Sequence, residues 1–597
     1  MTRPRLLLTS VFGPYGVKDA WGEALGCQME LLNNQITRCQ GIHSPRQSYW
    51  SFALYLMAEN LSIPTTVLDF PDWGIFTREV DQGGYTHVGI SFIVPNVLKA
   101  RRMALYLREK HPDIKILLGG YGTIIPDLAE IVPHDAACVG EGVAWLRRYF
   151  GEDENAPLRH PALVGPALEY LYGKRLRPSG GILMPGLGCE NGCVFCVTSH
   201  KFHKCYIPLL KTGRDVFEAC LRADREKHLT GFSVMDENFL KQPARARELL
   251  AEMEAHGKPY VFDLFSSAET IRALGVDFLV RLGVRMVWIG VESRFATHPK
   301  TRGIDLRALI RELQDHGIIV QASMILFQDH HTPENIWEDI DWAISLDSSL
   351  AQFMNYTPYP GTALYRAKEA EGTLKPVHYR HQHGQGELVF EHPAFPDSRD
   401  HARILREAFR RKYLRGGPGI VNMARTLVTG LIRNREAYES RRRDGLVWDP
   451  DQLRYVPSPG HQHPVQDRFM RMRLLMSARM AARLRPALLP ALVYAPNRAA
   501  RRKTRETMRL YREALGPATM ADRIRGLALV LTGGLELLRL GWNRLLGRES
   551  IVRQPPCRVT RYRWETATIV DSATALIEDL QRTLQPPEFR EDGRLSP

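Results

Sequence analysis

The sequence lacks the features that would place it in a membrane or in an oxidising compartment. It has no uninterrupted apolar run of about 18 residues, so we expect no membrane-spanning helix. The opening MTRPRLLLTS is followed by no small-residue cleavage site, so it predicts a first β-strand rather than a signal peptide. Only nine cysteines occur in 597 residues, which favours a reducing compartment over a disulfide framework. We therefore expect a cytoplasmic protein.

Acidic residues are scarce in one part of the chain only. The whole chain has a net charge of +14, with 80 Lys and Arg against 66 Asp and Glu. Residues 401–560 hold 33 Lys and Arg against 12 Asp and Glu, a net of +21, which leaves about −7 for the rest. Such an asymmetry suggests an acidic or anionic partner for the basic part.

Residues 1–155 alternate short apolar runs with helical patterns, which predicts a doubly wound parallel sheet. Ligands of such sheets lie beyond the carboxyl ends of the strands. Three predicted strands end in small or turn-forming residues, where a backbone can approach a ligand closely. These candidates for ligand contact are Ser91, Gly119, Gly120, Gly140, Glu141 and Gly142. The alternative is that the glycines only form tight turns.

The β/α alternation stops over residues 156–180, a proline-containing segment that we interpret as a linker, and it resumes over 181–395. There, six apolar runs separated by helical patterns predict a complete or partial (β/α)6 barrel. Polar residues cluster where these runs end, which is where such barrels place their chemistry: Cys189, Asp236–Asn238, Ser266–Ser267 and Glu292–Ser293. Residues 396–597 show no such alternation and predict a mostly helical, basic region.

Three cysteines follow the first run of the predicted barrel with the spacing C-x3-C-x2-C: Cys189, Cys193 and Cys196. A structural zinc site needs a closed tetrahedral set, which His200 or His203 could complete. No second ligand pair follows at finger-like spacing, which weighs against zinc. A [4Fe-4S] cluster normally takes four cysteines, so three would leave one iron open to another ligand.

This loop, with the aromatic Phe195 just before its last cysteine, resembles the radical S-adenosylmethionine (SAM) superfamily. The resemblance implies that SAM binds the open iron of the cluster through its amino and carboxylate groups. It also implies that an electron from the cluster cleaves SAM to methionine and a 5′-deoxyadenosyl radical. An external reductant of the flavodoxin or ferredoxin type would supply that electron.

Further matches to the family cover residues 181–395. MDENF stands where the family contacts the SAM amino group, which makes Asp236 and Glu237 candidates, although a solvated loop is the alternative. IGVES resembles the fourth-strand motif near the ribose and methionine, which points to Glu292 and Ser293. By the same resemblance Phe195 would pack on the adenine edge, unless it only packs within the loop. An arginine expected near SSAET is absent, so no role is assigned there.

The sheet ahead of the barrel, with GISFIVPN, LLGGYGT and CVGEGVAWL, is similar to that of the cobalamin-binding branch. That resemblance implies a cobalamin held over the barrel mouth and methylation of an unactivated carbon. The chain lacks the Asp-x-His-x-x-Gly motif of many cobalamin domains, as do many members of this branch. His43 is the one histidine of the long loop after the first strand, and a surface-loop role suits it better than cobalt ligation.

The basic C-terminal region combines arginines with Leu, Met and Ala at helical spacing, and the segment 523–548 ends near Trp542. Interfacial helices have this composition. Three interpretations stay open: a helical cap on the barrel, contact with the inner face of the membrane, and binding of nucleic acid. Nucleic acid is the least favoured, because aromatics are sparse and no known nucleic-acid module occurs. Membrane contact would suit a lipid-like substrate.

The leading functional hypothesis is a cobalamin-dependent radical SAM C-methyltransferase acting on a small-molecule or lipid-like substrate. Cyclisation, rearrangement or other C–H chemistry without methyl transfer is the alternative, since anaerobic porphyrin-ring cyclases share this architecture. Methylthio transfer to tRNA is disfavoured, because that group uses further front-domain cysteines that are not grouped here. A more distant alternative is a zinc-stabilised nucleic-acid-binding protein.

Overall fold

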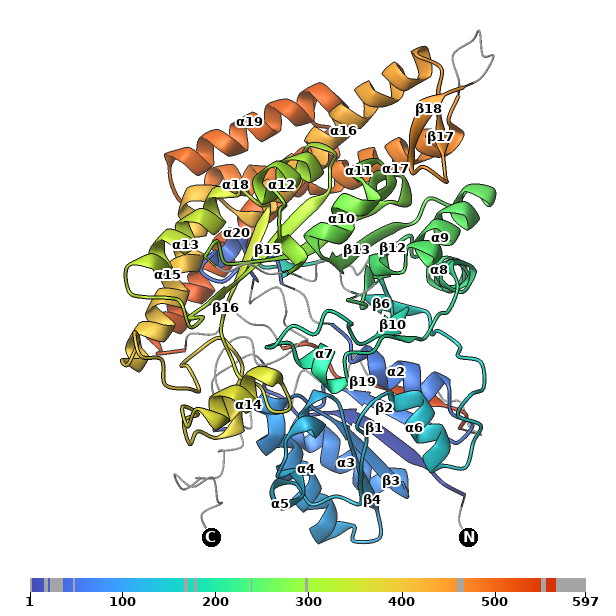
Figure 1. Cartoon of the computed structure of the whole chain (residues 1–597), viewed down its shortest axis with the longest axis vertical. Helices are drawn as coiled ribbons and strands as arrows, with labels where there is room; N and C mark the ends of the chain where they lie inside the picture. The colour runs from blue at the N-terminus through green and yellow to red at the C-terminus, as the bar shows by residue number, and fades with distance from the viewer. Residues whose placement is uncertain are drawn as a thin grey trace.

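Two parallel sheets, one from each β/α region, and a layer of C-terminal helices make up the fold (Figure 1). The computed structural model describes residues 3–15, 20–21, 36–46, 49–165, 170–176, 180–237, 239–295, 299–458, 466–548 and 554–564. The predicted α/β class is confirmed, and the predicted strands of both regions are present.

The front sheet has the strand order β2–β1–β3–β4–β5, with all five strands parallel. The strands are β1 (Leu6–Ser10), β2 (Thr65–Asp69), β3 (His87–Ser91), β4 (Lys115–Gly119) and β5 (Ala136–Ala137). Helices α3 (Trp73–Gly83) and α4 (Val97–Lys110) pack on one face. Helices α2 (Phe52–Glu59) and α6 (Gly142–Tyr149) pack on the other. The order reverses direction between β1 and β3, and ligands of doubly wound sheets bind at such a point.

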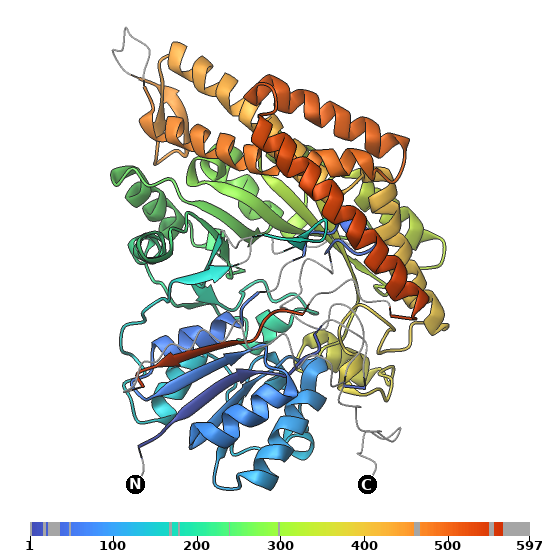
Figure 2. The same ribbon diagram turned by 180° about the vertical axis from the view of Figure 1, so that it is seen from behind.

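A sixth strand of the front sheet comes from the far end of the chain. β19 (Arg558–Tyr562) pairs antiparallel with β2, as Figure 2 shows. Its neighbours Cys557 and Trp564 pack against the core under α3 and α4. This strand was not predicted, because the sequence after residue 396 has the pattern of a mostly helical region.

The second sheet has seven strands in the order β16–β15–β14–β13–β12–β9–β6. Its six parallel strands are β9 (Gly180–Leu183), β12 (Gly231–Val234), β13 (Val261–Ser266), β14 (Val284–Glu292), β15 (Ile319–Leu326) and β16 (Leu350–Asn355). They coincide with the six apolar runs. The seventh, β6 (Leu163–Gly165), is antiparallel to β9 and lies in the segment interpreted as a linker. A hairpin of β7 (Tyr170–Leu171) and β8 (Lys174–Arg175) lies there too.

Helices from within the second region cover one side of this sheet: α8 (Gly213–Lys227), α9 (Pro243–Ala255), α12 (Leu306–Asp315) and α13 (Asn335–Ser345). α15 (Ser398–Gly416) also packs there, against β16. The C-terminal helices are α16 (Gly419–Arg443), α17 (Arg468–Leu484), α18 (Leu488–Val493), α19 (Arg498–Leu515) and α20 (Met520–Leu545). A hairpin of β17 (Leu446–Asp449) and β18 (Arg454–Pro457) interrupts them.

The C-terminal helices close the second sheet at the amino ends of its strands. Arg473 of α17 donates hydrogen bonds to the carbonyls of Tyr260, Arg281 and Leu282, next to β13 and β14. Gly430 of α16 lies against Gly317, where a Cβ would stand 2.1 Å from the Gly317 Cα. The interpretation of this region as a cap thus has direct structural support. None of the described helices combines the length and apolarity needed to span a bilayer.

Candidate functional site

The three-cysteine loop lies between the two sheets, where Figure 1 shows α7 (Val197–Lys201). Cys189 follows β10 (Gly186–Leu187), and Cys196 is the residue before α7. The Ser199 hydroxyl fixes the loop, because it donates to the Cys189 carbonyl at 2.6 Å and accepts from the Gly192 N–H at 3.0 Å. Gly192 has a φ of +64°, a conformation that favours glycine.

The three thiols are close enough to affect one another's protonation. Burial raises the pKa of Cys196 to about 11, and the charges of Cys193 and Cys189 add to this rise. Burial also raises the pKa of Cys193, while Lys300 opposes the rise. Cys189 itself is 6% exposed. Lys300 offsets the effect of burial on Cys193 only in part, so these thiols are poor thiolates by themselves, and the loop suits a bound cationic metal centre that would deprotonate them.

The cysteine sulfurs are not arranged as the tetrahedral set that a single zinc ion needs. With Zn–S bonds of about 2.3 Å, tetrahedral sulfur ligands stand about 3.8 Å apart. In the described part of the chain, the ligand atoms that gather within 4.8 Å of one another are those of His330, His331 and Asp339, not the cysteine sulfurs. His203, one proposed fourth ligand, is exposed. His200, the other, receives the Ala363 N–H on its Nε2 at 3.5 Å.

Glu292 and Phe195, both predicted site residues, lie beside the cysteines. Glu292 ends β14 with a φ of +58°, after a register irregularity next to Gly290. Its carboxylate pairs with Lys300, whose Nζ lies 5.9 Å from the centre of the Phe195 ring. Burial alone would lower the pKa of Lys300, but Glu292 and the cysteines Cys193 and Cys196 raise it overall. Lys300 was not predicted as a site residue, because it belongs to no local sequence motif.

The two acidic candidates after β12 have different roles in the structure. Asp236 is 1% exposed and accepts from Arg245 Nη2 at 2.9 Å and from the Tyr206 hydroxyl at 2.6 Å. Its carboxylate is thus used in a buried ion pair. Glu237 accepts from the Thr198 hydroxyl at 3.3 Å, on the helix that follows the cysteine loop. Burial raises the pKa of Glu237 to about 7, and the charge of Asp236 contributes. Asn238 lies outside the described residues.

Ser293 makes its contacts away from the cysteine loop. Its hydroxyl lies 3.0 Å from His330 Nε2 and accepts the Phe295 N–H at 3.1 Å. The neighbouring His331 and Asp339 are bonded at 3.0 Å and are both fully buried. Asp339 also accepts the Arg294 N–H, so this group supports the end of β14.

The carboxyl edge of the front sheet touches the cysteine loop directly. The Tyr121 hydroxyl, two residues beyond β4, lies 3.1 Å from the Thr198 hydroxyl. Lys201 at the end of α7 donates to the Gly120 carbonyl and to the Thr123 hydroxyl, both at 2.9 Å. The carboxyl ends of the two sheets therefore face each other across the three cysteines.

The front-sheet candidates divide into two groups. Ser91 pairs in register with Ser10 of β1 and Gly119 of β4, at the point where the strand order reverses. A Cβ built on Gly119 or on Gly140 would meet no atom within 4 Å, so both glycines leave open space.

The other front-sheet candidates have structural roles. A Cβ on Gly120 would lie 2.4 Å from the Phe92 carbonyl, and one on Gly142 would lie 2.7 Å from the Met57 sulfur. Glu141 caps α6 by accepting the N–H groups of Val143 and Ala144, both at 2.6 Å. These three residues fit the tight-turn and capping alternative.

His43 is buried rather than on a surface loop, so that expectation was wrong. Its Nδ1 lies 3.2 Å from the Tyr172 hydroxyl and its Nε2 3.0 Å from the Tyr494 carbonyl. Burial lowers its pKa to about 4. Both ring nitrogens are bonded under the C-terminal helices, so His43 is not a candidate for cobalt ligation.

No family model matches the chain. An uncharacterized methyltransferase of Pyrococcus horikoshii is 25% identical over 243 residues, which cover 39% of this chain and 51% of that protein. An anaerobic magnesium-protoporphyrin IX monomethyl ester cyclase of Rubrivivax gelatinosus is 26% identical over 339 residues, which cover 47% of this chain and 58% of that protein. The chain thus spans little more than half the length of these curated relatives.

Two solved structures of TsrM, a radical SAM methyltransferase of Kitasatospora setae, are also similar. One, with cobalamin and a [4Fe-4S] cluster bound, has a TM-score of 0.46 and 16% identity over 86% of this chain and 100% of that one. The other, with tryptophan substrate and a SAM analog, has a TM-score of 0.45 and 15% identity over 85% and 99%. The curated relatives are a methyltransferase and an anaerobic porphyrin-ring cyclase, so the predicted resemblance is confirmed.

The buried pair of Asp236 and Arg245 gives a testable prediction. Arg245→Met leaves Asp236 without its cation in a site where the two side chains are 0% and 4% exposed. We expect the free energy of unfolding to fall by about 3–5 kcal/mol. Adding Asp236→Asn should restore at least about half of this loss, because the uncompensated charge is removed. Denaturant titration of the four proteins of the cycle measures the coupling, and strictly additive losses would contradict the pairing.

Proposed function

We propose that the chain is a radical SAM enzyme whose three-cysteine loop holds a [4Fe-4S] cluster and whose front sheet holds cobalamin. The proposal rests on one observation above all. Three cysteines, Cys189 buried and Cys193 and Cys196 half-buried, lie at the carboxyl ends of one parallel sheet and face the carboxyl edge of a second. We propose residues 1–155 with strand 558–562 as the cobalamin-binding-like domain, 181–395 as the radical SAM core and 396–548 as its cap. The described part of 156–180 joins the first two.

When bound, the cluster supplies the electron that cleaves SAM, and cobalamin carries the methyl group. Cys189, Cys193 and Cys196 would hold the cluster as thiolates. Lys300 favours this state, because its charge lowers the pKa of Cys193 against the effect of burial. Glu237, whose pKa is about 7, would become a carboxylate beside a cationic amino group and accept its hydrogen bonds. Asp236 would instead position Glu237 through the Arg245 pair.

Cobalamin would lie over the open end of the front sheet, along Ser91, Gly119 and Gly140. Gly119 and Gly140 are the positions where the backbone leaves free space. Both ring nitrogens of His43 are already hydrogen-bonded, which agrees with a cobalamin whose cobalt has no histidine ligand from this loop. C-methylation of an unactivated carbon is the proposed reaction, and radical cyclisation or rearrangement without methyl transfer is the alternative. Retention of cobalamin by the chain would favour C-methylation over radical chemistry without methyl transfer.

The cluster proposal predicts the effect of single cysteine substitutions. Cys189→Ala, Cys193→Ala and Cys196→Ala should each lose most of the about four irons per chain and all reductive SAM cleavage. Cys205→Ala is a matched control, because Cys205 lies just after α7 but is exposed and bonds only to the His203 carbonyl among the described contacts. Iron analysis measures the loss of the cluster, and 5′-deoxyadenosine formation measures the loss of SAM cleavage. Full iron in the Cys189→Ala protein, or zinc in its place, would refute the assignment.

The cobalamin proposal predicts that a side chain at Gly119 blocks the cofactor without disturbing the fold. Gly119→Leu meets no atom at its Cβ in the free protein, so the unfolding temperature should be unchanged. Cobalt retained after incubation with hydroxocobalamin and desalting should fall at least tenfold from a near-stoichiometric value. Lys110→Leu at the carboxyl end of α4, an exposed position at the opposite edge of the sheet, should retain cobalt. Equal cobalt in the wild-type chain and Gly119→Leu would place cobalamin elsewhere.

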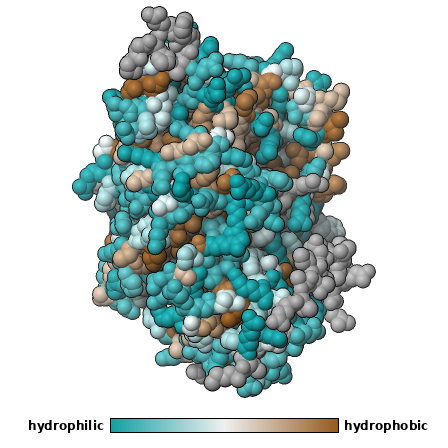
Figure 3. All heavy atoms as spheres, turned by 90° about the vertical axis from the view of Figure 1, so that its right-hand side faces the viewer, coloured by the Kyte–Doolittle hydropathy of each residue, from teal (hydrophilic) through white to brown (hydrophobic). Residues whose placement is uncertain are grey.

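Helix α20 supports a membrane-surface partner. Seven of its apolar side chains form an exposed stripe with steps of three and four residues, each 58–80% exposed: Ile524, Leu527, Leu531, Leu535, Leu538, Trp542 and Leu545. By contrast, the flank of the molecule in Figure 3 is mostly hydrophilic, with apolar residues in small groups. A continuous stripe of this kind on one helix marks an interaction surface.

The charges beside the stripe favour an anionic bilayer over a second copy of the chain. The helix and the residues just after it carry Arg523, Arg525, Arg539, Arg544 and Arg548. Its two carboxylates are already used, since Asp522 caps the helix and the buried Glu536 pairs with Arg46 and Arg539. Two such helices face to face would bring arginines together, whereas anionic headgroups would neutralise them.

Membrane contact is tested with vesicles. The full chain should co-sediment with vesicles that contain anionic lipid, and less with neutral ones. Leu531→Gln with Leu538→Gln should weaken this at least tenfold, because each leucine contributes about 1.5–3 kcal/mol on burial. Both are 72% exposed, so folding is unaffected. Leu475→Gln, at a position 56% exposed on α17, is the matched control. Unchanged binding in the double variant would reject α20 as the contact.

A further inference from the structure

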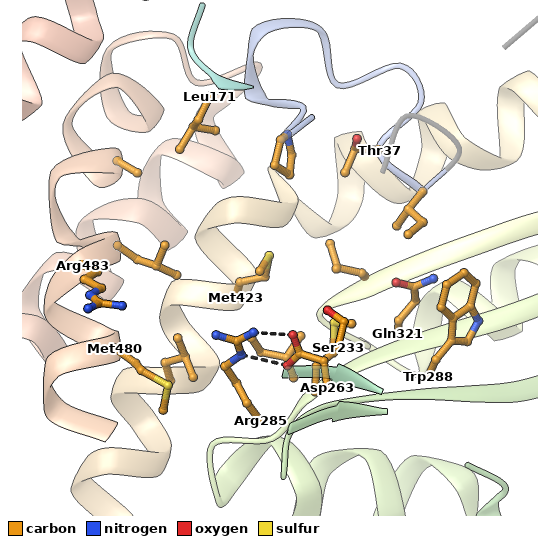
Figure 4. A pocket seen from close by; sticks show the side chains of 18 of the residues that line it. Thr37, Leu171, Ser233, Asp263, Arg285, Trp288, Gln321, Met423, Met480 and Arg483 are labelled. Carbon is orange, nitrogen blue, oxygen red and sulfur yellow. Dashed lines mark hydrogen bonds and ion pairs between the residues drawn. The ribbon is translucent and has the colours of Figure 1, made fainter. Parts of the chain in front are cut away.

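A cavity of about 310 Å³ lies between the second sheet and the C-terminal helices, on the side away from α8, α9, α12 and α13 (Figure 4). Strands β12 to β16 form its floor, and α16, α17 and α20 form its walls together with residues 36–45. The lining is mainly large apolar and aromatic side chains, chiefly Phe265, Met286, Trp288, Met423, Leu427 and Met480. An apolar or flat molecule would fit such a surface.

The polar side chain of Gln321 in this cavity has no hydrogen-bond partner among the described residues. Gln321 lies in the middle of β15, beside Trp288 of β14 and Leu350 of β16 in the strand register. It is 0% exposed, yet in the part of the chain that the structure describes neither the oxygen nor the nitrogen of its amide has a hydrogen-bond partner. Burying an unpaired amide is costly, and few such groups occur in folded proteins. A ligand that offers a donor next to an acceptor would satisfy both atoms.

The charges on the floor of the cavity are balanced, which favours an uncharged ligand beside them. Arg285 and Asp263 on its floor form a two-pronged ion pair, with Arg285 Nε 2.8 Å from Asp263 Oδ1 (Figure 4). A ligand charge near this pair would have no counter-ion and would be costly to desolvate. Arg483 also lines the cavity, but it is exposed and lies across the cavity from Gln321 in Figure 4.

The cavity and the cysteine site share their strands. Ser233 and Met235 line the cavity on β12 and just after it, and Glu237 follows two residues later at the cysteine loop. On β14, Trp288 lines the cavity and Glu292 lies at the site four residues on, a distance of about 13 Å along a strand. If one end of a molecule is held at Gln321, its other end would therefore point toward the carboxyl ends of the strands, where the cysteines lie.

We propose that this cavity binds the substrate. The structure assigns it to an uncharged molecule with an apolar body and an amide-like edge, a hydrogen-bond donor beside an acceptor, that pairs with Gln321. The assignment rests on the proposed function for calling the ligand a substrate, while the binding itself requires neither cluster nor cobalamin. Leu529, on the face of α20 opposite its exposed stripe, closes the cavity on one side.

Calorimetric titration of the full chain with three ten-carbon probes tests the assignment. Decanamide offers donor and acceptor, methyl decanoate only an acceptor, and decanoate a charge. We expect decanamide to bind at least tenfold tighter than either of the others. The titrations use the Leu531→Gln/Leu538→Gln background, so that the stripe on α20 does not bind the alkyl chains.

Two cavity variants and a control complete the test. Gln321→Leu should weaken decanamide by about 5–30-fold and methyl decanoate by less, because the ester can only accept one hydrogen bond from Gln321, whereas the amide pairs with both of its polar atoms. Leu427→Trp should abolish binding of all three probes by filling the space. Gln352→Leu is the matched control: this buried glutamine of β16 already accepts from the Ser323 hydroxyl at 3.3 Å and does not line the cavity. Its decanamide affinity should be that of the parent.

The outcomes separate this inference from the proposed function. Equal affinity of decanamide for the parent and the Gln321→Leu protein, or tighter binding of decanoate, would overturn the assignment even if the chain cleaves SAM. Selective decanamide binding that is lost in Gln321→Leu supports it, even if no cluster assembles. In that second case the proposed ligand class would be supported, and the proposed radical chemistry would be rejected.

Discussion

The structure depends on the contact by which the cysteine loop meets the front sheet. Lys201 donates to a backbone carbonyl and a hydroxyl of the loop after β4, and Tyr121 from that loop reaches back to Thr198. Burial lowers the pKa of Lys201 to about 8, so the ammonium is held by oxygen acceptors rather than by water. This contact sets the carboxyl ends of two independent sheets against each other. A ligand at either edge is then within reach of the other.

The electrostatics of the site follow from this burial. Two carboxylates, Glu237 and Glu292, and three thiols are brought together, and one lysine, Lys300, lies among them. Groups that become negative on losing a proton outnumber the one lysine, which leaves the site ready for a cationic centre or co-substrate that would deprotonate them. The adjacent Asp236 does not add to this excess, because Arg245 neutralises it within the core.

Sequence predicted those parts of the molecule whose signal is local. The strands of both sheets appear as apolar runs, since parallel strands are buried on both faces. The three cysteines and Glu292 were found through motif spacing. Lys300, Tyr121 and Lys201 were missed, because they act through the meeting of distant segments, and a lone lysine or tyrosine carries no motif.

Two other features, strand β19 and Gln321, were not predicted, for different reasons. Strand β19 was hidden because it pairs antiparallel at the sheet edge, where a strand needs only one buried face and leaves no apolar run. Gln321 did leave a signal that was overlooked. It is the polar residue inside the apolar run IIVQASMILF, and a polar side chain in a strand buried on both faces calls for a partner.

The C-terminal region connects the two sheets, the cavity and the exposed stripe of α20. α20 is anchored to the loop of residues 41–46 by the buried pair of Arg46 and Glu536, whose side chains are 6% and 1% exposed. Beyond it, β19 completes the front sheet. The same segment therefore bridges both sheets, closes the cavity with Leu529 and presents an apolar stripe outward. Glu536 pairs with both Arg46 and Arg539, so the position of this helix is fixed by the core rather than by what it touches outside.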